Sequence, residues 1–180
     1  MATTGIFTVL ASVQETLDSP ENRSGSINNS IRQNYSYIDG TGAGQNDLVW
    51  SDRFTIAAGD TAVIDLRPLS LDLGGGAGAV AQTDSFGAVI NFVEVTAILI
   101  YNKETGAGRT VSFGPGTGTP FLWTFLNASD LVSIAPSGAY LQWTDVGVTT
   151  GAGASDVLRL INTDGAQTVS LDIIIVGRTA

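Results

Sequence analysis

FVEVTAILIYN, residues 92–102, is the stretch of sequence that decides the fold. It is rich in β-branched and aliphatic residues, which favour extended strands. One alternating set, at positions 93, 95, 97, 99 and 101, is non-polar up to its aromatic end, and the other set, at positions 92, 94, 96, 98 and 100, is mixed. This pattern predicts a strand with one buried face and a second face that is partly covered.

Two further segments show the same period of two. In residues 61–66, Ala62, Ile64 and Leu66 share one face, and in residues 168–176 every odd position from Val169 is aliphatic. Pro68 should end the first of these strands, because proline cannot donate to a ladder. Shorter strand-like runs lie between turn-forming residues at 5–14, 48–50, 54–56, 110–113, 121–126, 131–134, 140–143 and 156–162.

About eight to ten short strands with frequent turns are typical of an all-β sandwich or barrel. We expect an antiparallel two-sheet β-sandwich of jelly-roll type over residues 47–180. An Ig-like sandwich is the alternative, because strand count and turn spacing do not separate the two topologies. Residues 1–46 are expected to form an extended N-terminal arm with one or two irregular strands, since the polar stretch 15–46 is longer than ordinary loops.

Composition removes many classes of function. The 180 residues contain no Cys and no His, which excludes thiol nucleophiles, Ser-His pairs and zinc sites built on these ligands. A formal net charge of −9 disfavours nucleic acid as a partner. We expect no signal peptide, transmembrane segment or membrane partner, because the N-terminus has no basic and apolar leader and no apolar stretch is long enough.

The acidic residues are weighed as catalytic groups next. Most of the 17 neighbour turn residues, where they cap turns and solubilise the surface. Glu94, Asp65 and Asp172 lie within strand patterns and are ambiguous. No Ca²⁺-loop motif occurs. We therefore expect a protein that is not an enzyme, with no catalytic residue, metal or cofactor.

Candidate contact residues follow from the aromatic and basic side chains. Tyr35 and Tyr37 are two positions apart in the polar arm, so an extended chain places them on one side, where they could anchor a partner. Arg23 and Arg32 belong to the same arm and could contact an acidic neighbour. A hairpin packed on its own domain is the competing interpretation. Trp50 and Trp143 are the candidates for an alternative function, carbohydrate binding.

The order of segments in the C-terminal two-thirds carries a resemblance. Residues 58–66 are followed by an I-x-N strand end at 100–102, a Pro/Gly turn at 134–138, an L-x-L-x-N strand at 158–162 and a terminal I-x-I-x-G strand at 173–177. This layout resembles the capsid decoration or auxiliary proteins of tailed bacteriophages and related phage β-sandwich proteins. Residues 1–46 are not covered.

The resemblance implies a structural role in a virion. We expect copies that associate with one another, for instance as trimers, and bind the major capsid protein to decorate or cement the capsid, after synthesis in the host cytoplasm. An N-terminal arm could donate a strand to a neighbouring sheet edge. The alternatives are a phage tail or fibre component and a carbohydrate-binding β-sandwich module. A glycoside-processing enzyme ranks below both.

Overall fold

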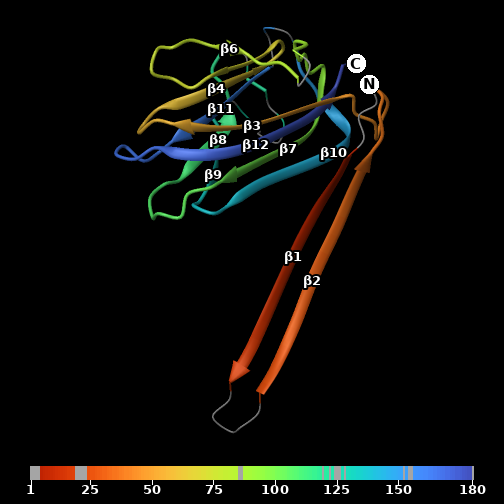
Figure 1. Cartoon of the computed structure of the whole chain (residues 1–180), viewed down its shortest axis with the longest axis vertical. Coiled ribbons are helices and arrows are strands. Elements are labelled where there is room, and N and C mark those ends of the chain that lie inside the picture. The colour runs from red at the N-terminus through yellow and green to blue at the C-terminus, as the bar shows by residue number, and fades with distance from the viewer. Residues whose placement is uncertain are drawn as a thin grey trace.

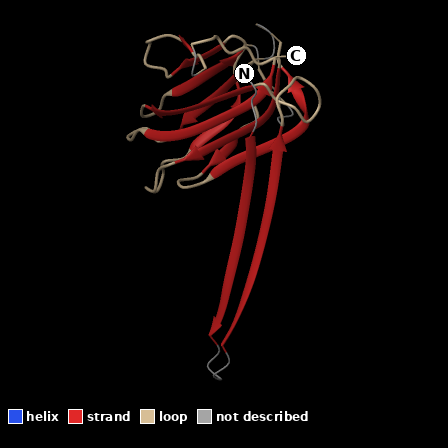
Figure 2. Ribbon diagram, turned by 45° about the vertical axis from the view of Figure 1, so that its right-hand side comes forward, coloured by secondary structure: helices blue, strands red, loops and turns tan. Residues whose placement is uncertain are grey.

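The structure is a computed structural model. It describes residues 5–18, 24–84, 87–118, 120, 121, 123, 127, 129–151, 153 and 156–179, with 5–18 and 24–37 described by their backbone alone. Within these ranges all regular secondary structure is β, as predicted, and a two-layer sandwich carries a long two-stranded ribbon (Figure 1; Figure 2). A helix of the length and hydropathy needed to cross a membrane is not found in the described ranges.

Two antiparallel sheets form the sandwich. The four-stranded sheet has the order β10 (Ala139–Thr149), β7 (Glu94–Asn102), β12 (Val169–Arg178) and β3 (Leu48–Ile56). The six-stranded sheet has the order β6 (Val80–Ala81), β5 (Leu69–Asp72), β4 (Thr61–Leu66), β11 (Val157–Asn162), β8 (Val111–Pro115) and β9 (Val132–Ile134). The Gly/Ala-rich segment 72–82 contains the two-residue strand β6.

The strand pairs are nested, which identifies the jelly roll. β3 pairs with β12, β4 with β11, β7 with β10, and β8 with β9. Successive pairs alternate between the two sheets, as when one long antiparallel hairpin is rolled around a core. The expected jelly-roll sandwich is confirmed. An Ig-like order does not fit, because there the first strand pairs with the next strand along the chain, whereas β3 pairs with the last strand, β12.

The hydrophobic core lies between the two sheets. The predicted inward faces of β4 and β12 are confirmed, because their alternating aliphatic residues are all buried there. Phe92, Phe113 and Phe121 are the largest fully buried side chains and fill the space between the layers. Pro68 follows the end of β4, as the sequence predicts.

The faces of β7 differ from the sequence pattern. Ile98 and Ile100, from the mixed set, are buried in the core, whereas Leu99 and Tyr101, from the non-polar set, are on the outer face. The cause is an irregularity in the pairing with β12: Val176 pairs with residue 97, but Gly177 pairs with residue 95. This bulge changes the alternation, so that Val95 also faces the core. The outer face of this sheet is therefore non-polar.

The N-terminal region forms a regular ribbon instead of the irregular strands expected. β1 (Gly5–Asp18) pairs with β2 (Ser24–Tyr37) without a bulge, from Gly5 opposite Tyr37 to Asp18 opposite Ser24. At 14 residues a strand, the ribbon is about 48 Å long. It leaves one end of the sandwich beside β10 and points away from both sheets (Figure 1; Figure 2).

Candidate interaction surface

Three of the four predicted arm residues belong to the ribbon. Arg23 lies outside the described residues, and the backbone of Arg32, Tyr35 and Tyr37 lies in β2. Tyr35 and Tyr37 occupy alternate positions and so share one face of the ribbon, opposite Phe7 and Gly5 in the register. Arg32 occupies a position on the other face.

The two candidate tryptophans do not form one platform. Trp50 is only 4% exposed and belongs to the core between the sheets, which leaves no ring surface for stacking on a sugar. Trp143 lies on the opposite, outer face of the four-stranded sheet, partly exposed, against Ala97 and Val176. Its indole Nε1 donates a hydrogen bond to Asp145 at 2.9 Å. Carbohydrate binding stays a prediction, with Trp143 as its candidate.

The register of the ribbon separates its residues into two unlike faces. Alternate positions of paired strands lie on the same face. One face collects nearly all of the larger non-polar residues, together with a single charged residue, Glu15. The non-polar positions on this face are Phe7, Val9, Ala11, Val13, Leu17, Ile27, Ile31, Tyr35 and Tyr37. The other face is mostly Ser, Thr, Asn and Gln, but Ile6 and Leu10 also lie there. The ribbon is therefore amphipathic, with most of its larger non-polar positions on one face.

A second non-polar surface covers the outer side of the four-stranded sheet. Outward positions of a sandwich strand are usually polar. Here only Ser51, Arg53 and Asp172 are polar among the positions that the register aligns in three rows across the strands. The rows, from β3 to β10, are Ser51-Ile174-Leu99-Leu141, Val49-Val176-Ala97-Trp143 and Arg53-Asp172-Tyr101-Ala139. We call this surface the outer β10-β7-β12-β3 face.

The outer face is partly open to solvent. Tyr101 is 39% exposed, and Leu99, Leu141 and Ile174 are partly exposed. Among the described segments, no further layer stacks on this face (Figure 1; Figure 2). Single exposed hydrophobic residues are normal on proteins, but a contiguous set across four strands indicates an interaction surface.

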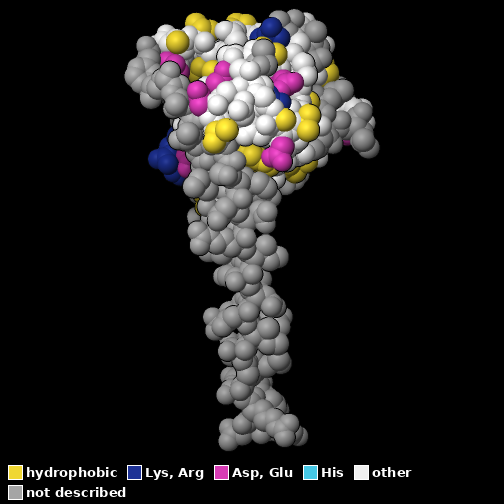
Figure 3. Space-filling view, turned by 90° about the vertical axis from the view of Figure 1, so that its right-hand side faces the viewer, with side chains coloured by type: hydrophobic (Ala, Val, Ile, Leu, Met, Phe, Trp, Pro, Cys, Tyr) yellow, Lys and Arg dark blue, Asp and Glu magenta, His cyan; other side chains and the backbone are white. Residues whose placement is uncertain are grey.

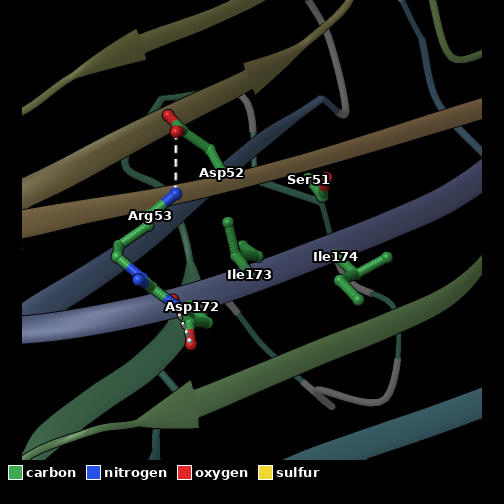
Figure 4. A pocket seen from close by; sticks show the side chains of 6 residues that line it. All are labelled: Ser51, Asp52, Arg53, Asp172, Ile173 and Ile174. Carbon is green, nitrogen blue, oxygen red and sulfur yellow. Dashed lines mark hydrogen bonds and ion pairs between the residues drawn. The ribbon is translucent and has the colours of Figure 1, made fainter.

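An ion-pair cluster occupies one row of the outer face. Arg53 Nε donates to Asp172 Oδ1 at 2.6 Å, and Lys103 Nζ lies 3.7 Å from Asp172 Oδ2. The hydrogen bond from Arg53 holds the pKa of the Asp172 carboxyl below its ordinary value, although partial desolvation opposes the shift. The cluster contains two cations and one anion, so its formal net charge is +1. A shallow depression beside it also includes Ser51 and Ile174 (Figure 4).

The root of the ribbon is fastened to the sandwich by Arg178. This residue, in β12, is 4% exposed, and its Nε donates to Glu94 Oε2 of β7. Nη1 donates to the carbonyl of Gly42 at 2.6 Å and more weakly to that of Gln45 at 3.4 Å, while Nη2 donates to the carbonyl of Val146. One buried guanidinium thus joins β7, β10, β12 and the segment that follows the ribbon.

Further contacts fix residues 38–47, which link the ribbon to β3. The buried Thr96 hydroxyl donates to Asn46 Oδ1 at 2.5 Å, and Asn46 is itself fully enclosed. The amides of Gly44 and Asp47 donate to the carbonyls of Asp145 and Gly177. Acidic and hydrophobic side chains are intermixed on the surface of this end of the sandwich (Figure 3). The ribbon therefore starts from a well-fixed point.

The three ambiguous acids serve structural contacts. Glu94 pairs with Arg178, Asp172 pairs with Arg53, and Asp65 Oδ1 accepts the amide of Arg67 at 2.9 Å. Burial raises the pKa of Asp65. Among the residues that the structure describes, no group of three or more acidic side chains is placed to hold a metal ion.

A separate groove lies at the open edge of the sandwich, between β3 and the loop that joins β5 to β6. Its non-polar lining includes Phe54, Leu71, Leu73 and Val80, of which Val80 is 61% exposed. β3 is an edge strand, and edge strands can accept another strand. The groove is therefore a second candidate for contact with a partner.

Comparisons with known proteins identify no family for this chain. No family model matches the chain, and no curated protein matches it. Among solved structures, a Bacillus chain from work on endospore appendages, described as a novel family of disulfide-linked pili, is similar over 79% of this chain and 97% of that chain. The identity is 16% and the TM-score is 0.35, and a likeness of this degree supports no inference about function.

Two features of this surface were not predicted from the sequence. Arg178 gave no distinctive signal beyond being a charged residue at the end of a long aliphatic strand. The non-polar outer face had a signal in the sequence, since both alternating sets of residues 92–102 contain large aliphatic residues. That pattern predicts a second face that is partly covered. The structure leaves this face partly exposed.

Proposed function

We propose that this chain is a non-enzymatic structural protein that works by self-association. The observation that carries the proposal is the amphipathic β1–β2 ribbon, which projects from the sandwich and has no third strand from the described part of its own chain. An isolated two-stranded ribbon is marginally stable in water. Such a ribbon gains stability when its non-polar face is covered by a partner.

The size of the ribbon favours assembly over a single tight contact. Two strands of about 48 Å length and about 10 Å combined width present roughly 450 Å² on one face. One docked ribbon then buries at most roughly 900 Å² in total, which is below the roughly 1,000 Å² expected of a stable specific interface and is typical of a weak contact. Affinity would come from many such contacts acting together. A lattice that repeats the contact many times provides this multivalency.

The setting that we propose is a bacteriophage virion, where the protein decorates or cements the capsid and contacts the major capsid protein. The support is the layout of residues 58–66, 95–102 and 134–177, which resembles decoration proteins. Mass spectrometry of purified particles from the source culture tests it: the chain should be found in the particles, and its absence from them would exclude the virion setting.

Self-association is tested with charges placed on the ribbon. Val9→Glu with Ile31→Glu changes two positions of the non-polar face, and Thr8→Glu with Ser30→Glu adds the same charges to neighbouring positions on the other face. We expect light scattering after size exclusion to show concentration-dependent oligomers for the wild type and the control, and monomers for the first variant. A wild type that stays monomeric up to millimolar concentration would refute the proposal.

A further inference from the structure

We propose that the outer β10-β7-β12-β3 face of one copy is the docking surface for the β1–β2 ribbon of a second copy. This inference rests on the proposed function, since it requires self-association, and it names the surface that receives the ribbon. The partner is a second copy of this chain, because each copy carries both a non-polar ribbon face and a non-polar sheet face that its own described segments leave partly open.

The two surfaces match in polarity. The centre of the outer face consists of Leu99, Ile174 and Leu141, which the register aligns in one row across three strands. The non-polar face of the ribbon carries aliphatic and aromatic positions along most of its length. Apolar surfaces of this kind are buried together because water is released from both. The receiving face is wide enough for the ribbon, since four strands span about 19 Å and the ribbon about 10 Å.

The two surfaces also match in charge. The chain carries a formal net charge of −9, so copies repel one another over most contacts. The non-polar ribbon face has one charged position, Glu15, and the ion-pair cluster on the outer face has a formal net charge of +1 from Arg53, Lys103 and Asp172. The single charged position of the non-polar ribbon face is therefore opposite in sign to the ion-pair cluster of the receiving face.

The contact is heterologous, because the ribbon of one copy binds a different surface on the next. A heterologous contact forms a closed ring when its rotation closes and an open chain when it does not. The ribbon does not cover the outer β10-β7-β12-β3 face of its own copy, because it points away from the sandwich and the segment that follows it is held by hydrogen bonds. Assembly by this contact is consequently intermolecular.

The test separates donor from acceptor in the full-length chain. The donor-deficient variant is Val9→Glu with Ile31→Glu, and the acceptor-deficient variant is Ile174→Glu, at an outward position of β12. Val63→Glu is the matched control, because Val63 is an outward, partly exposed residue of the other sheet. Leu141→Glu, on the edge strand β10, is the second acceptor variant for the case that Ile174→Glu does not fold.

Each deficient variant alone should be monomeric in light scattering, with its apparent Kd for self-association raised at least about tenfold, while Val63→Glu should assemble like the wild type. A mixture of the two deficient variants should form heterodimers and nothing larger, because only one productive contact remains for each pair.

Other outcomes overturn the inference in distinguishable ways. If the donor-deficient variant alone forms dimers, the outer face pairs with itself, and if the acceptor-deficient variant alone forms the wild-type oligomers, the ribbon binds elsewhere. Loss of assembly in Val80→Glu but not in Ile174→Glu would place the ribbon in the groove beside β3. A wild type that never self-associates would instead refute the proposed function itself.

Discussion

Replacing Arg178 with Met is the sharpest perturbation of the ribbon root. The thioether side chain keeps most of the length and volume of the arginine but removes every donor. The carbonyls of Gly42 and Val146 and the carboxylate of Glu94 then lose the guanidinium that they share. Removing one partner of a buried ion pair costs about 3–5 kcal/mol. Because Glu94 is 27% exposed and water can reach it, we expect the lower end of this range.

A loss of about 3 kcal/mol lowers the melting temperature of a domain of this size by roughly 6–12 °C. Urea unfolding followed by tryptophan fluorescence measures the free energy directly. Hydrogen exchange of the amides of Gly44, Asn46 and Asp47 should also accelerate, since their segment loses its contacts to the guanidinium. These two readouts distinguish a local loosening of the root from a general loss of stability.

Arg53→Met is the matched control. Arg53 also pairs with a carboxylate, but its side chain is 68% exposed, and exposed ion pairs contribute little to stability. We expect its unfolding curve to overlie that of the wild type. If Arg178→Met changes the free energy of unfolding by less than about 1 kcal/mol, the arginine is not the structural fastener that its contacts indicate.

Two further predictions concern buried and titrating groups. Thr96→Val should lower the free energy of unfolding by about 1–3 kcal/mol, because it leaves the enclosed Asn46 Oδ1 without the hydroxyl that donates to it. In a urea-based double-mutant cycle, Thr96→Val combined with Asn46→Leu should cost less than the sum of the two single changes. The second group is Glu104, whose pKa is lowered first by the amide of Ser170 and then by Arg109. The ionised Glu104 carboxylate stabilises the fold fully above its unfolded pKa of about 4.3, and this stabilisation is lost as pH falls through the lowered folded pKa. The difference in free energy of unfolding between wild type and Glu104→Gln should therefore close between pH 7 and pH 3. A difference that stays constant over this range would contradict the contacts assigned to Glu104.

The strands with simple alternation were predictable from sequence because one face of each is uniformly aliphatic. For β4 and β12 the inward residues were identified correctly. In residues 92–102 both alternating sets contain large aliphatic residues, and the bulge in the pairing with β12 decides which set is buried. Such a bulge depends on a strand about 80 positions away, so local sequence does not reveal it.

The jelly-roll order and the ribbon also depend on distant pairings. Turn spacing predicted many short strands, but the nesting of β3 with β12 and of β4 with β11 distinguishes the jelly roll from the Ig-like order. In residues 24–37, Ile27, Ile31 and Tyr35 recur every four positions among polar residues, which is too sparse for a strand signal. The pairing with β1 gathers them on one face. The four-residue spacing was the overlooked clue.

The candidate interaction surface was less predictable from the sequence than the fold was. The carboxylates, Tyr35 and Tyr37 were singled out because their types are common in functional sites, whereas the surface found here consists of ordinary aliphatic residues such as Leu99 and Ile174. These residues matter because they occupy outward positions of a sheet, and residue type alone does not predict such a position.

Electron microscopy of the assembled full-length protein tests the central claim most directly. The account predicts density for a two-stranded ribbon from each copy lying across β10, β7, β12 and β3 of its neighbour, with Leu99 and Ile174 beneath it. A ribbon that runs free into solvent, or that pairs along the edge of β3, would contradict the assignment of this face as the receiving surface.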